Sequence, residues 1–230
     1  MVSVLIPAYK EARILPDTVA RLIAELEGAE PAFEILICDD GSADETAAVV
    51  AALQDPRVQC VTGAHTGKGG ALARGVAAAK GELIFYTDAD LAYGTAVIPR
   101  FLHALRQGEA EIVIGSRPLH KQGYAGYSRL RRVLSRGYQA CLRHFGGIAA
   151  GDPQCGCKAY TARAAKQLFA GLTETGFAFE FETLLRAKKA GLAVLELPVR
   201  VLANGTSHVR PLRDGVTMLR AARKLRRIYK

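Results

Sequence analysis

Two aspartates, two positions apart, are the residues of this sequence that most directly suggest chemistry. Asp88 and Asp90 follow the apolar, β-prone run from Leu83 to Tyr86, which predicts a buried strand. In an open α/β sheet, ligands bind where the strands end. A divalent cation between these carboxylates and a substrate's phosphates would offset the cost of leaving them unpaired, and Mg²⁺ is commonly bound in this way. A solvated Asp-Ala-Asp turn is the alternative that these residues leave open.

The composition limits the classes of protein to be considered. The chain has 230 residues, half of them hydrophobic, which is enough for one large domain. A net charge of +9 favours an anionic partner, which could be a phosphate compound, an acidic lipid surface or nucleic acid. Five widely spread cysteines argue against a disulfide framework and fit a reducing cytoplasm. We expect neither a signal peptide nor a membrane-spanning helix.

A regular alternation of strands and helices would position the aspartates. Strands are predicted at Val2 to Ile6, Phe33 to Cys38, Val58 to Thr62, Leu83 to Asp88 and Ile112 to Ile114, and helices at Leu15 to Glu27, Ala43 to Leu53, Gly69 to Lys80 and Val97 to Arg106. Ser42 and Glu45 have the spacing of a capping box at the start of the second helix. The alternation predicts an α/β fold with a mostly parallel sheet covered on both faces. The loops after the strands should then meet at one edge of the sheet.

The loop sequences disfavour two common nucleotide-binding motifs. A dinucleotide-binding fold needs G-x-G-x-x-G after its first strand, where this chain has Pro-Ala-Tyr-Lys-Glu. The segment 63–69 is one residue too short for a P-loop, and Gly69 replaces the Ser/Thr that would bind Mg²⁺. Glycines beside Lys68 at a helix start can still meet a phosphate, or they form a plain turn. Asp39 and Asp40 could accept hydrogen bonds from a base and a ribose, or cap the next helix.

Short segments along the chain resemble, in order and spacing, the family 2 glycosyltransferases with a GT-A fold. In the first half these are residues 7–11 (PAYKE), 39–42 (DDGS), 67–69 (GKG), 88–90 (DAD) and 115–117 (GSR). In the second half, residues 152–158 (DPQCGCK), 176–182 (GFAFEFE) and 196–199 (ELPV) look like the dolichyl-phosphate β-glucosyltransferase branch and its bacterial relatives. The chain departs from the family pattern at Lys10 and His65, where Asn is usual, at Cys157, which replaces Phe, and at Ala92-Tyr93, which replaces Ser-Thr.

The resemblance implies a role for individual residues. The nucleotide-sugar-binding set would be Pro7, Ala8, Tyr9, Glu11, Asp39, Asp40, Lys68, Asp88 and Ala89. Asp88 and Asp90 would hold Mg²⁺ or Mn²⁺, with Asp90 as the direct ligand, to neutralise charge on the leaving nucleotide. Attack by a phosphate acceptor with inversion needs no protein nucleophile. Asp152 is then expected to act as base or as organiser of the acceptor, with capping of its Gly-Asp-Pro turn as the alternative.

Two basic segments have an apolar helical stripe. The first carries Tyr127, Leu130, Leu134, Tyr138, Cys141 and Phe145 among Arg129, Arg131, Arg132, Arg136 and Arg143; the second carries Val216, Leu219, Ala222, Leu225 and Ile228. Such helices can lie in an anionic membrane interface, or they can bury the stripe in the protein. Arg117 and Arg131 are candidates for the acceptor phosphate, because guanidinium pairs with phosphate bidentately. Arg210 is a further phosphate candidate, in a segment where relatives place a loop that closes over the donor.

The resemblance implies one GT-A domain over residues 1–230, with a nucleotide-sugar half (1–117), an acceptor half (118–210) and a basic interfacial helix (211–230). The expected reaction is inverting, metal-dependent transfer of a hexose to a polyprenyl or dolichyl phosphate at the cytoplasmic membrane face. UDP-glucose is the first donor considered and GDP-mannose the second. The expected partners are that donor, the lipid phosphate, an anionic membrane surface and a separate membrane protein.

Three alternatives stay open at this point. The first is a family 2 glycosyltransferase with a soluble glycan, protein or small-molecule acceptor. The second is a nucleic-acid-binding module, which is disfavoured because the chain has no such motif and its positive charge lies on apolar-striped helices. The third is a non-catalytic subunit, against which the intact Asp88, Asp90 and Asp152 argue.

Overall fold

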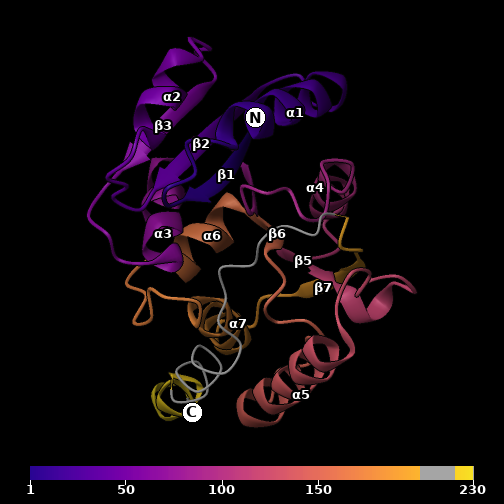
Figure 1. Ribbon diagram of the computed structural model, residues 1–230. Coiled ribbons are helices and arrows are strands. Elements are labelled where there is room, and N and C mark those ends of the chain that lie inside the picture. The colour runs from indigo at the N-terminus through magenta and orange to yellow at the C-terminus, as the bar shows by residue number, and fades with distance from the viewer. Residues whose placement is uncertain (203–220, 230) are drawn as a thin grey trace.

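The computed structural model describes residues 1–202 and 221–229, and it is built around a seven-stranded sheet with strand order β3-β2-β1-β4-β6-β5-β7 (Figure 1). The strands are β1 (Val2–Ala8), β2 (Phe33–Asp39), β3 (Val58–Thr62), β4 (Leu83–Thr87), β5 (Ile112–Ser116), β6 (Cys157–Thr161) and β7 (Val194–Pro198). Only β6 runs antiparallel to its neighbours, β4 and β5. The predicted α/β fold with a mostly parallel sheet is therefore confirmed.

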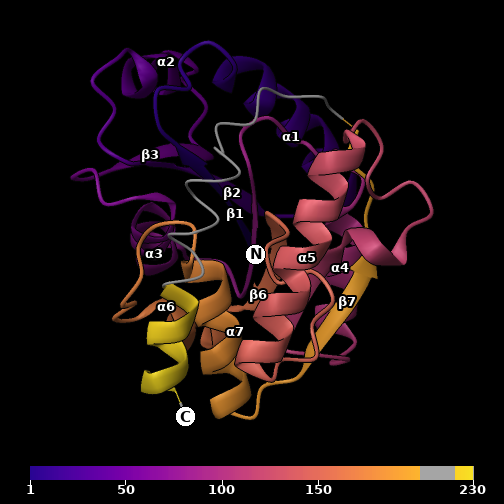
Figure 2. The same cartoon turned by 60° about the horizontal axis from the view of Figure 1, so that its bottom comes forward.

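Helices cover both faces of the sheet. They are α1 (Leu15–Ala29), α2 (Thr46–Ala52), α3 (Lys68–Ala78), α4 (Ile98–Arg106), the 3₁₀ turn η1 (Arg117–Leu119), α5 (Arg129–Gly146), α6 (Ala162–Phe169), α7 (Phe179–Lys189) and a C-terminal helix at 221–228. One core packs α1, α2 and α4 against the sheet, around residues such as Leu22 and Phe101. The other packs α3, α6 and α7, together with Leu142 of α5 and Leu225. The C-terminal helix lies beside α7 (Figure 2).

The predicted capping box at the start of the second helix is wrong. α2 begins at Thr46, three residues later than expected, and Glu45 at its N-cap makes no side-chain cap hydrogen bond. The hydroxyl of Ser42 accepts a hydrogen bond from the backbone N–H of Lys10 at 2.8 Å. Asp44 accepts from both the N–H and the hydroxyl of Thr46. Ser42 therefore fastens the loop after β1 to the loop after β2, and does not cap a helix.

The two basic helices bury apolar side chains in the protein. In α5, Gln139 and Leu142 are buried and Tyr138 of the predicted stripe is half-buried against the same core, whereas Cys141 of that stripe is exposed. The side chains of Leu130, Arg131, Leu134 and Phe145 lie outside the described part of the structure. In the C-terminal helix, Ala222 and Leu225 are fully buried and Ile228 is exposed. Over residues 1–202 and 221–229, no helix is long and apolar enough to cross a membrane.

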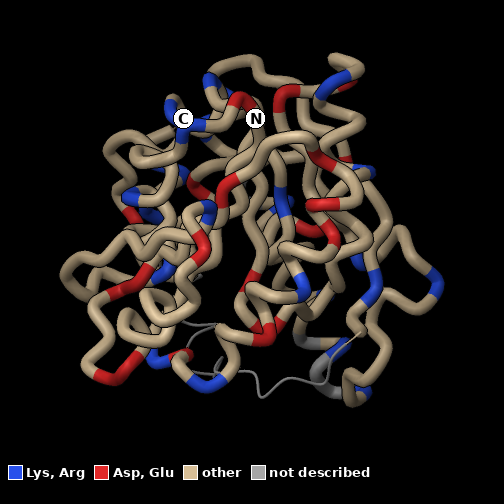
Figure 3. Tube along the Cα trace, turned by 90° about the horizontal axis from the view of Figure 1, so that it is seen from above, with Lys and Arg blue, Asp and Glu red and all other residues tan. Residues whose placement is uncertain are grey.

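The net charge of +9 is not confined to one part of the fold. Viewed from above, Lys and Arg are interspersed with Asp and Glu over the described part of the trace (Figure 3). Several arginines of α5 are exposed, namely Arg129, Arg132, Arg136 and Arg143. Any attraction of an anionic surface to this protein therefore depends on local groups of basic side chains such as those of α5.

Candidate active site

The loops after β1, β2 and β3 are tied together at one edge of the sheet, as the strand alternation predicts. The ring of Tyr9 stacks on that of His65, with 4.4 Å between their centroids. His65 Nδ1 lies 2.8 Å from a carboxylate oxygen of the buried Asp40. The same carboxylate accepts hydrogen bonds from the N–H groups of Thr66 (2.9 Å) and Gly67 (2.8 Å). Asp40 therefore holds the loop after β3 in place.

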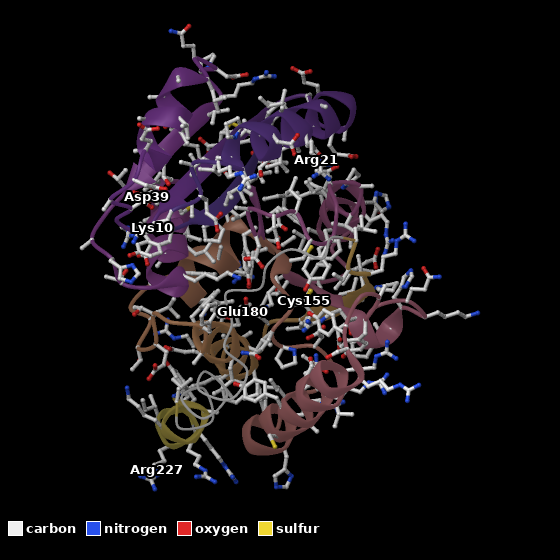
Figure 4. The ribbon with its side chains drawn as sticks, in the orientation of Figure 1. Lys10, Arg21, Asp39, Cys155, Glu180 and Arg227 are labelled. Atoms are coloured by element: carbon white, nitrogen blue, oxygen red, sulfur yellow. The ribbon has the colours of Figure 1, made fainter. Side chains whose placement is uncertain are left out.

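The other predicted nucleotide-binding residues of this edge differ in exposure. Pro7 and Ala8 are the last two residues of β1, and Ala8 is buried. Asp39, also buried, accepts a hydrogen bond from the N–H of Ser42 at 3.2 Å. Glu11 is half-buried. Tyr9 is 42% exposed, which leaves it the most accessible of the set for stacking with a base. Asp39 and the neighbouring Lys10 lie close together in Figure 4.

Asp88 and Asp90 lie in the tight turn that follows β4. The hydroxyl of Thr18 donates to the carbonyl of the buried Ala89 at 2.6 Å, and Leu91 has a positive φ of 47°. Asp88 Oδ1 lies 2.7 Å from Lys68 Nζ. Asp90 Oδ1 accepts from the N–H of Ala92 at 3.0 Å. Partial burial, and then the negative charge of Asp88, raise the pKa of Asp90 above its ordinary value. The two carboxylates thus repel each other.

Gly156, just before β6, allows the Asp88 carboxylate to occupy its position. A Cβ atom at residue 156 would lie 2.2 Å from Asp88 Oδ2, closer than atoms can approach without a shift. The register of β6 on β4, in which Cys157 pairs with Thr87, brings the glycine to this place. The glycine of the Cys-Gly-Cys segment therefore leaves the space that the Asp88 carboxylate occupies.

The two aspartates fit a hard divalent cation whose remaining ligands come from a substrate. In the described ranges, no group of three or more His, Cys, Asp or Glu side chains is arranged to hold a metal. Asp88 and Asp90 offer two carboxylates whose mutual repulsion a cation would relieve. Mg²⁺ is characteristically bound by one or two carboxylates together with substrate phosphates.

The start of α3 is less open to a phosphate than its glycines suggest. The N–H groups of Gly69 and Gly70 donate to the carbonyl of Thr175, at 2.7 and 3.2 Å. These helix N-terminal donors are therefore already used inside the protein. The ammonium of Lys68 is the group of this segment that reaches the aspartate turn, through Asp88.

Asp152 lies at the centre of a buried polar network on the other side of β4. The guanidinium of Arg117 meets both of its oxygens, with Nε at 2.5 Å and Nη2 at 2.7 Å. The N–H of Arg117 and the amide of Gln139 donate to Asp152 as well, at 3.1 and 2.6 Å. The side chain of Asp152 is fully buried and that of Arg117 nearly so. In this arrangement Asp152 organises Arg117, and both of its oxygens are engaged.

The network reaches α5 through residues for which the sequence predicted no such role. The hydroxyl of Tyr124 donates to Gln139 Oε1 at 3.0 Å, and Arg117 Nη1 donates to the Tyr127 hydroxyl at 3.0 Å. A lone Gln on an arginine-rich helix carries no sequence signal for such a role. The remaining acceptor-phosphate candidates are the side chain of Arg131 and the whole of Arg210, and both lie outside the described residues.

A second buried pair was also not expected from the sequence. Lys158 of β6 is fully buried, pairs with Glu180 of α7 and donates to the carbonyl of Pro153 at 2.9 Å. Glu180 also lies 3.4 Å from Lys68 Nζ. Phe179 and Phe181, which flank Glu180 in the sequence, are buried. The acidic residue between them was the available signal, because a charged side chain flanked by core residues needs a buried partner.

Comparison with known proteins assigns the chain to a family. The model of "Glycosyl transferase family 2" matches residues 3–169, well over half of the chain. This chain belongs to that family. The match covers the strands β1 to β6 and both polar clusters around Asp88 and Asp152.

Curated relatives extend over most of the chain. Glycosyltransferase AglD from Haloferax volcanii is 35% identical over 93% of this chain, and that match covers 35% of the relative. The dolichyl-phosphate beta-glucosyltransferase of Dictyostelium discoideum is 28% identical over 99% of the chain and 74% of the relative. The enzyme of the same name from Drosophila melanogaster is 32% identical over 86% of the chain and 66% of the relative. The chain thus spans about a third of the first of these proteins and two thirds or more of the others.

Solved structures establish the fold. Glucosyl-3-phosphoglycerate synthase from Mycobacterium tuberculosis, in complex with phosphoglyceric acid, superposes with a TM-score of 0.74 at 24% identity, over 98% of this chain and 79% of that one. The same enzyme in complex with Mn²⁺, UDP-glucose and phosphoglyceric acid gives 0.74 at 23% identity, with the same coverage. The predicted GT-A fold is therefore confirmed.

Proposed function

We propose that this chain transfers a hexose from a nucleotide sugar to a polyprenyl or dolichyl phosphate, with inversion. UDP-glucose is the first donor and GDP-mannose the second. The observation that carries glycosyl transfer is the pair Asp88 and Asp90, placed beyond β4 beside the tied loops of β1 to β3. Relatives named dolichyl-phosphate beta-glucosyltransferases, similar over most of the chain, favour the lipid phosphate as acceptor.

On the donor side, the described residues supply binding and orientation. Tyr9 offers an exposed ring to the base, and Asp39 and Asp40 are buried at the end of the neighbouring strand β2. Lys68 lies against Asp88, within reach of a diphosphate bound at the aspartates. Mg²⁺ or Mn²⁺ bound by Asp90 and Asp88 would neutralise the charge that develops on the leaving nucleotide.

On the acceptor side, the protein positions a nucleophile that is already ionised. A phosphate monoester has its second pKa near 6, so its oxygen can attack the anomeric carbon without a protein base. We assign Asp152 to organising Arg117, because the carboxylate is fully engaged by the guanidinium and by Gln139. Among the described residues, Arg117 is our candidate for attracting the acceptor phosphate to the Asp152 network, because its guanidinium is positively charged.

We propose that the reaction takes place at the cytoplasmic face of a membrane and that the protein binds there as a peripheral membrane protein. The exposed arginines of α5 support this placement, together with Val133, which is 66% exposed on the same helix. Each basic residue near an anionic leaflet contributes about 1 kcal/mol to attachment. A separate membrane protein that receives the lipid-linked sugar is part of the same proposal.

The test is a transfer assay with parallel donors and acceptors. Radiolabelled UDP-glucose and GDP-mannose are each incubated with the chain, Mn²⁺ and either a short polyprenyl phosphate or 3-phosphoglycerate. Label in the organic phase from one donor supports the proposal and names the sugar. Label only in the water-soluble product would replace the lipid by a small-molecule acceptor. No transfer to either acceptor by a folded protein would contradict the proposed function.

A further inference from the structure

Four side chains of alternating charge form a continuous chain beneath the aspartate turn. Asp88 Oδ1 lies 2.7 Å from Lys68 Nζ, and that ammonium lies 3.4 Å from Glu180 Oε1. The other oxygen of Glu180 pairs with Lys158. Asp88, on β4's turn, is 40% exposed, whereas Lys68, Glu180 and Lys158 are 16%, 6% and 0% exposed. The chain of charges therefore runs from the surface of the candidate site into the core.

Lys68 is the member of this chain that has two carboxylate partners. Its ammonium lies closer to the carboxylate of Asp88, at 2.7 Å, than to that of Glu180, at 3.4 Å. The rings of Tyr86 and Phe179 lie 5.8 and 6.0 Å from Nζ. The ammonium of Lys68 therefore has a carboxylate within reach on each side.

Lys158 makes Glu180 a permanent second partner for that ammonium. A buried carboxylate without a partner would take up a proton or destabilise the fold. The fully buried Lys158, fixed by the carbonyl of Pro153 at 2.9 Å, pairs with one oxygen of Glu180, and the other oxygen of Glu180 faces Lys68 at 3.4 Å. Figure 4 shows Glu180 near the middle of the view, and its side chain is 6% exposed.

The geometry points to Lys68 as an internal counter-ion that occupies Asp88 in the absence of a divalent cation and is transferred to Glu180 when the cation binds. This inference rests on the proposed function, because it takes Asp88 and Asp90 as the cation site. A cation near Asp88 repels an ammonium 2.7 Å from the same carboxylate, and like charges at such distances repel strongly where water is scarce. The displaced ammonium can then pair with the carboxylate of Glu180.

The consequence is that Lys68 and Glu180 act on cation affinity in opposite directions. Removing the ammonium in Lys68→Met removes the competitor, so Mn²⁺ should bind about tenfold more tightly, a change that corresponds to ~1.4 kcal/mol. Removing the second partner in Glu180→Gln leaves the ammonium on Asp88, so Mn²⁺ should bind several-fold more weakly. Loss of a residue that serves only the fold would weaken binding in both variants.

A double-mutant cycle separates partner exchange from simple charge effects. A distant loss of negative charge at Glu180 would weaken Mn²⁺ binding equally whether or not Lys68 is present. Partner exchange predicts that Glu180→Gln has almost no effect in the Lys68→Met background, since no ammonium then needs a second partner. If Glu180→Gln does not fold, the variant Glu180→Gln with Lys158→Met, which removes both charges of the buried pair, takes its place in the cycle.

The experiment measures free Mn²⁺ by electron paramagnetic resonance during titration of the whole chain, without donor or acceptor and again with UDP. Lys10→Met is the matched control, because it removes one positive charge from an exposed lysine whose Nζ lies 5.2 Å from the Tyr9 ring. Its affinity for Mn²⁺ should change less than twofold. Tighter binding by Lys68→Met, weaker binding by Glu180→Gln and a non-additive cycle are the result expected.

The outcomes distinguish this inference from the proposed function. If the wild-type chain binds no Mn²⁺ even with UDP, or if Asp90→Asn leaves its binding unchanged, the cation site of the proposed function fails and the inference fails with it. If Asp90→Asn abolishes binding but Lys68→Met does not tighten it, or the cycle is additive, the inference alone is overturned.

Discussion

The carboxylates of the aspartate turn, Asp88 and Asp90, differ from the carboxylate of Asp152 in how far their negative charge is compensated by neighbouring donors. At the aspartate turn, Asp88 is 40% exposed and pairs with Lys68, and the pKa of Asp90 is raised by partial burial and then by the charge of Asp88. Around Asp152, by contrast, each oxygen accepts hydrogen bonds from charged or amide donors, and the side chain is fully buried. Unsatisfied charge marks a place for a ligand, whereas satisfied buried charge fixes the protein around it. We therefore assign the chemistry to the first cluster and the positioning to the second.

The largest effect expected is on activity, at the aspartate turn. Asp90→Asn should lower the transfer rate at least about a thousandfold, or ~4 kcal/mol, because the direct cation ligand is lost. Since the substitution also removes the repulsion between Asp90 and Asp88, the free energy of unfolding should stay nearly unchanged. Label transfer and urea unfolding of the same preparation measure the two quantities. Full activity in a folded Asp90→Asn protein would contradict the assignment of the chemistry to the aspartate turn.

The second prediction concerns Asp152, where we expect the substitution to lower the stability of the fold. Asp152→Ala leaves the guanidinium of Arg117 buried without its partner, and breaking a buried ion pair in this way costs about 3–5 kcal/mol. We expect the free energy of unfolding to fall by that amount in urea denaturation. A variant that keeps wild-type stability but loses transfer would instead show that Asp152 is a base.

A smaller effect is expected at the glycine beneath Asp88. Gly156→Ala would place a Cβ atom 2.2 Å from Asp88 Oδ2, so the carboxylate has to move. A displacement of about 1 Å can cost as much as a hundredfold in rate. Gly28→Ala is the control, because nothing lies within 4 Å of its Cβ position in α1, and it should leave transfer unchanged. Equal rates for the two variants would show that the position of Asp88 is unimportant.

The smallest effect concerns the loops that carry the donor-side residues. Ser42→Ala removes an exposed hydrogen bond to the N–H of Lys10, so the free energy of unfolding should fall by about 0.5–1.5 kcal/mol. Glu45→Ala should change it by less than about 0.5 kcal/mol, because Glu45 caps no helix through its side chain. Thermal unfolding compares the two. A larger loss of unfolding free energy for Glu45→Ala than for Ser42→Ala would show that Glu45 does cap the helix.

Local patterns in the sequence predicted most of the sheet. The parallel strands β1 to β4 are apolar runs between helical patterns, and the structure has them within one or two residues of the predicted bounds. The strand β6 was missed because Cys157 to Thr161 contains a lysine and is not a continuous apolar run, and its antiparallel place between β4 and β5 depends on partners far away in the chain. No local pattern contains that information.

The candidate site was predicted in its residue types better than in its contacts. The aspartates at the end of β4 follow from strand length and position alone. The partners of Asp152 could not be found in this way, because Gln139 comes from the middle of a basic helix and reaches the site only through tertiary packing. The partnership of Lys68 with both Asp88 and Glu180 likewise joins three distant segments.

The most direct test of this division of roles is transfer of label from UDP-glucose to a short polyprenyl phosphate by wild type and Asp90→Asn, each with Mn²⁺ and with chelator. The account predicts organic-phase label from the wild-type chain with Mn²⁺ only. It also predicts none above background from a folded Asp90→Asn chain. Undiminished transfer by the variant, or by the wild type in chelator, would contradict the assignment of the chemistry to the aspartate turn.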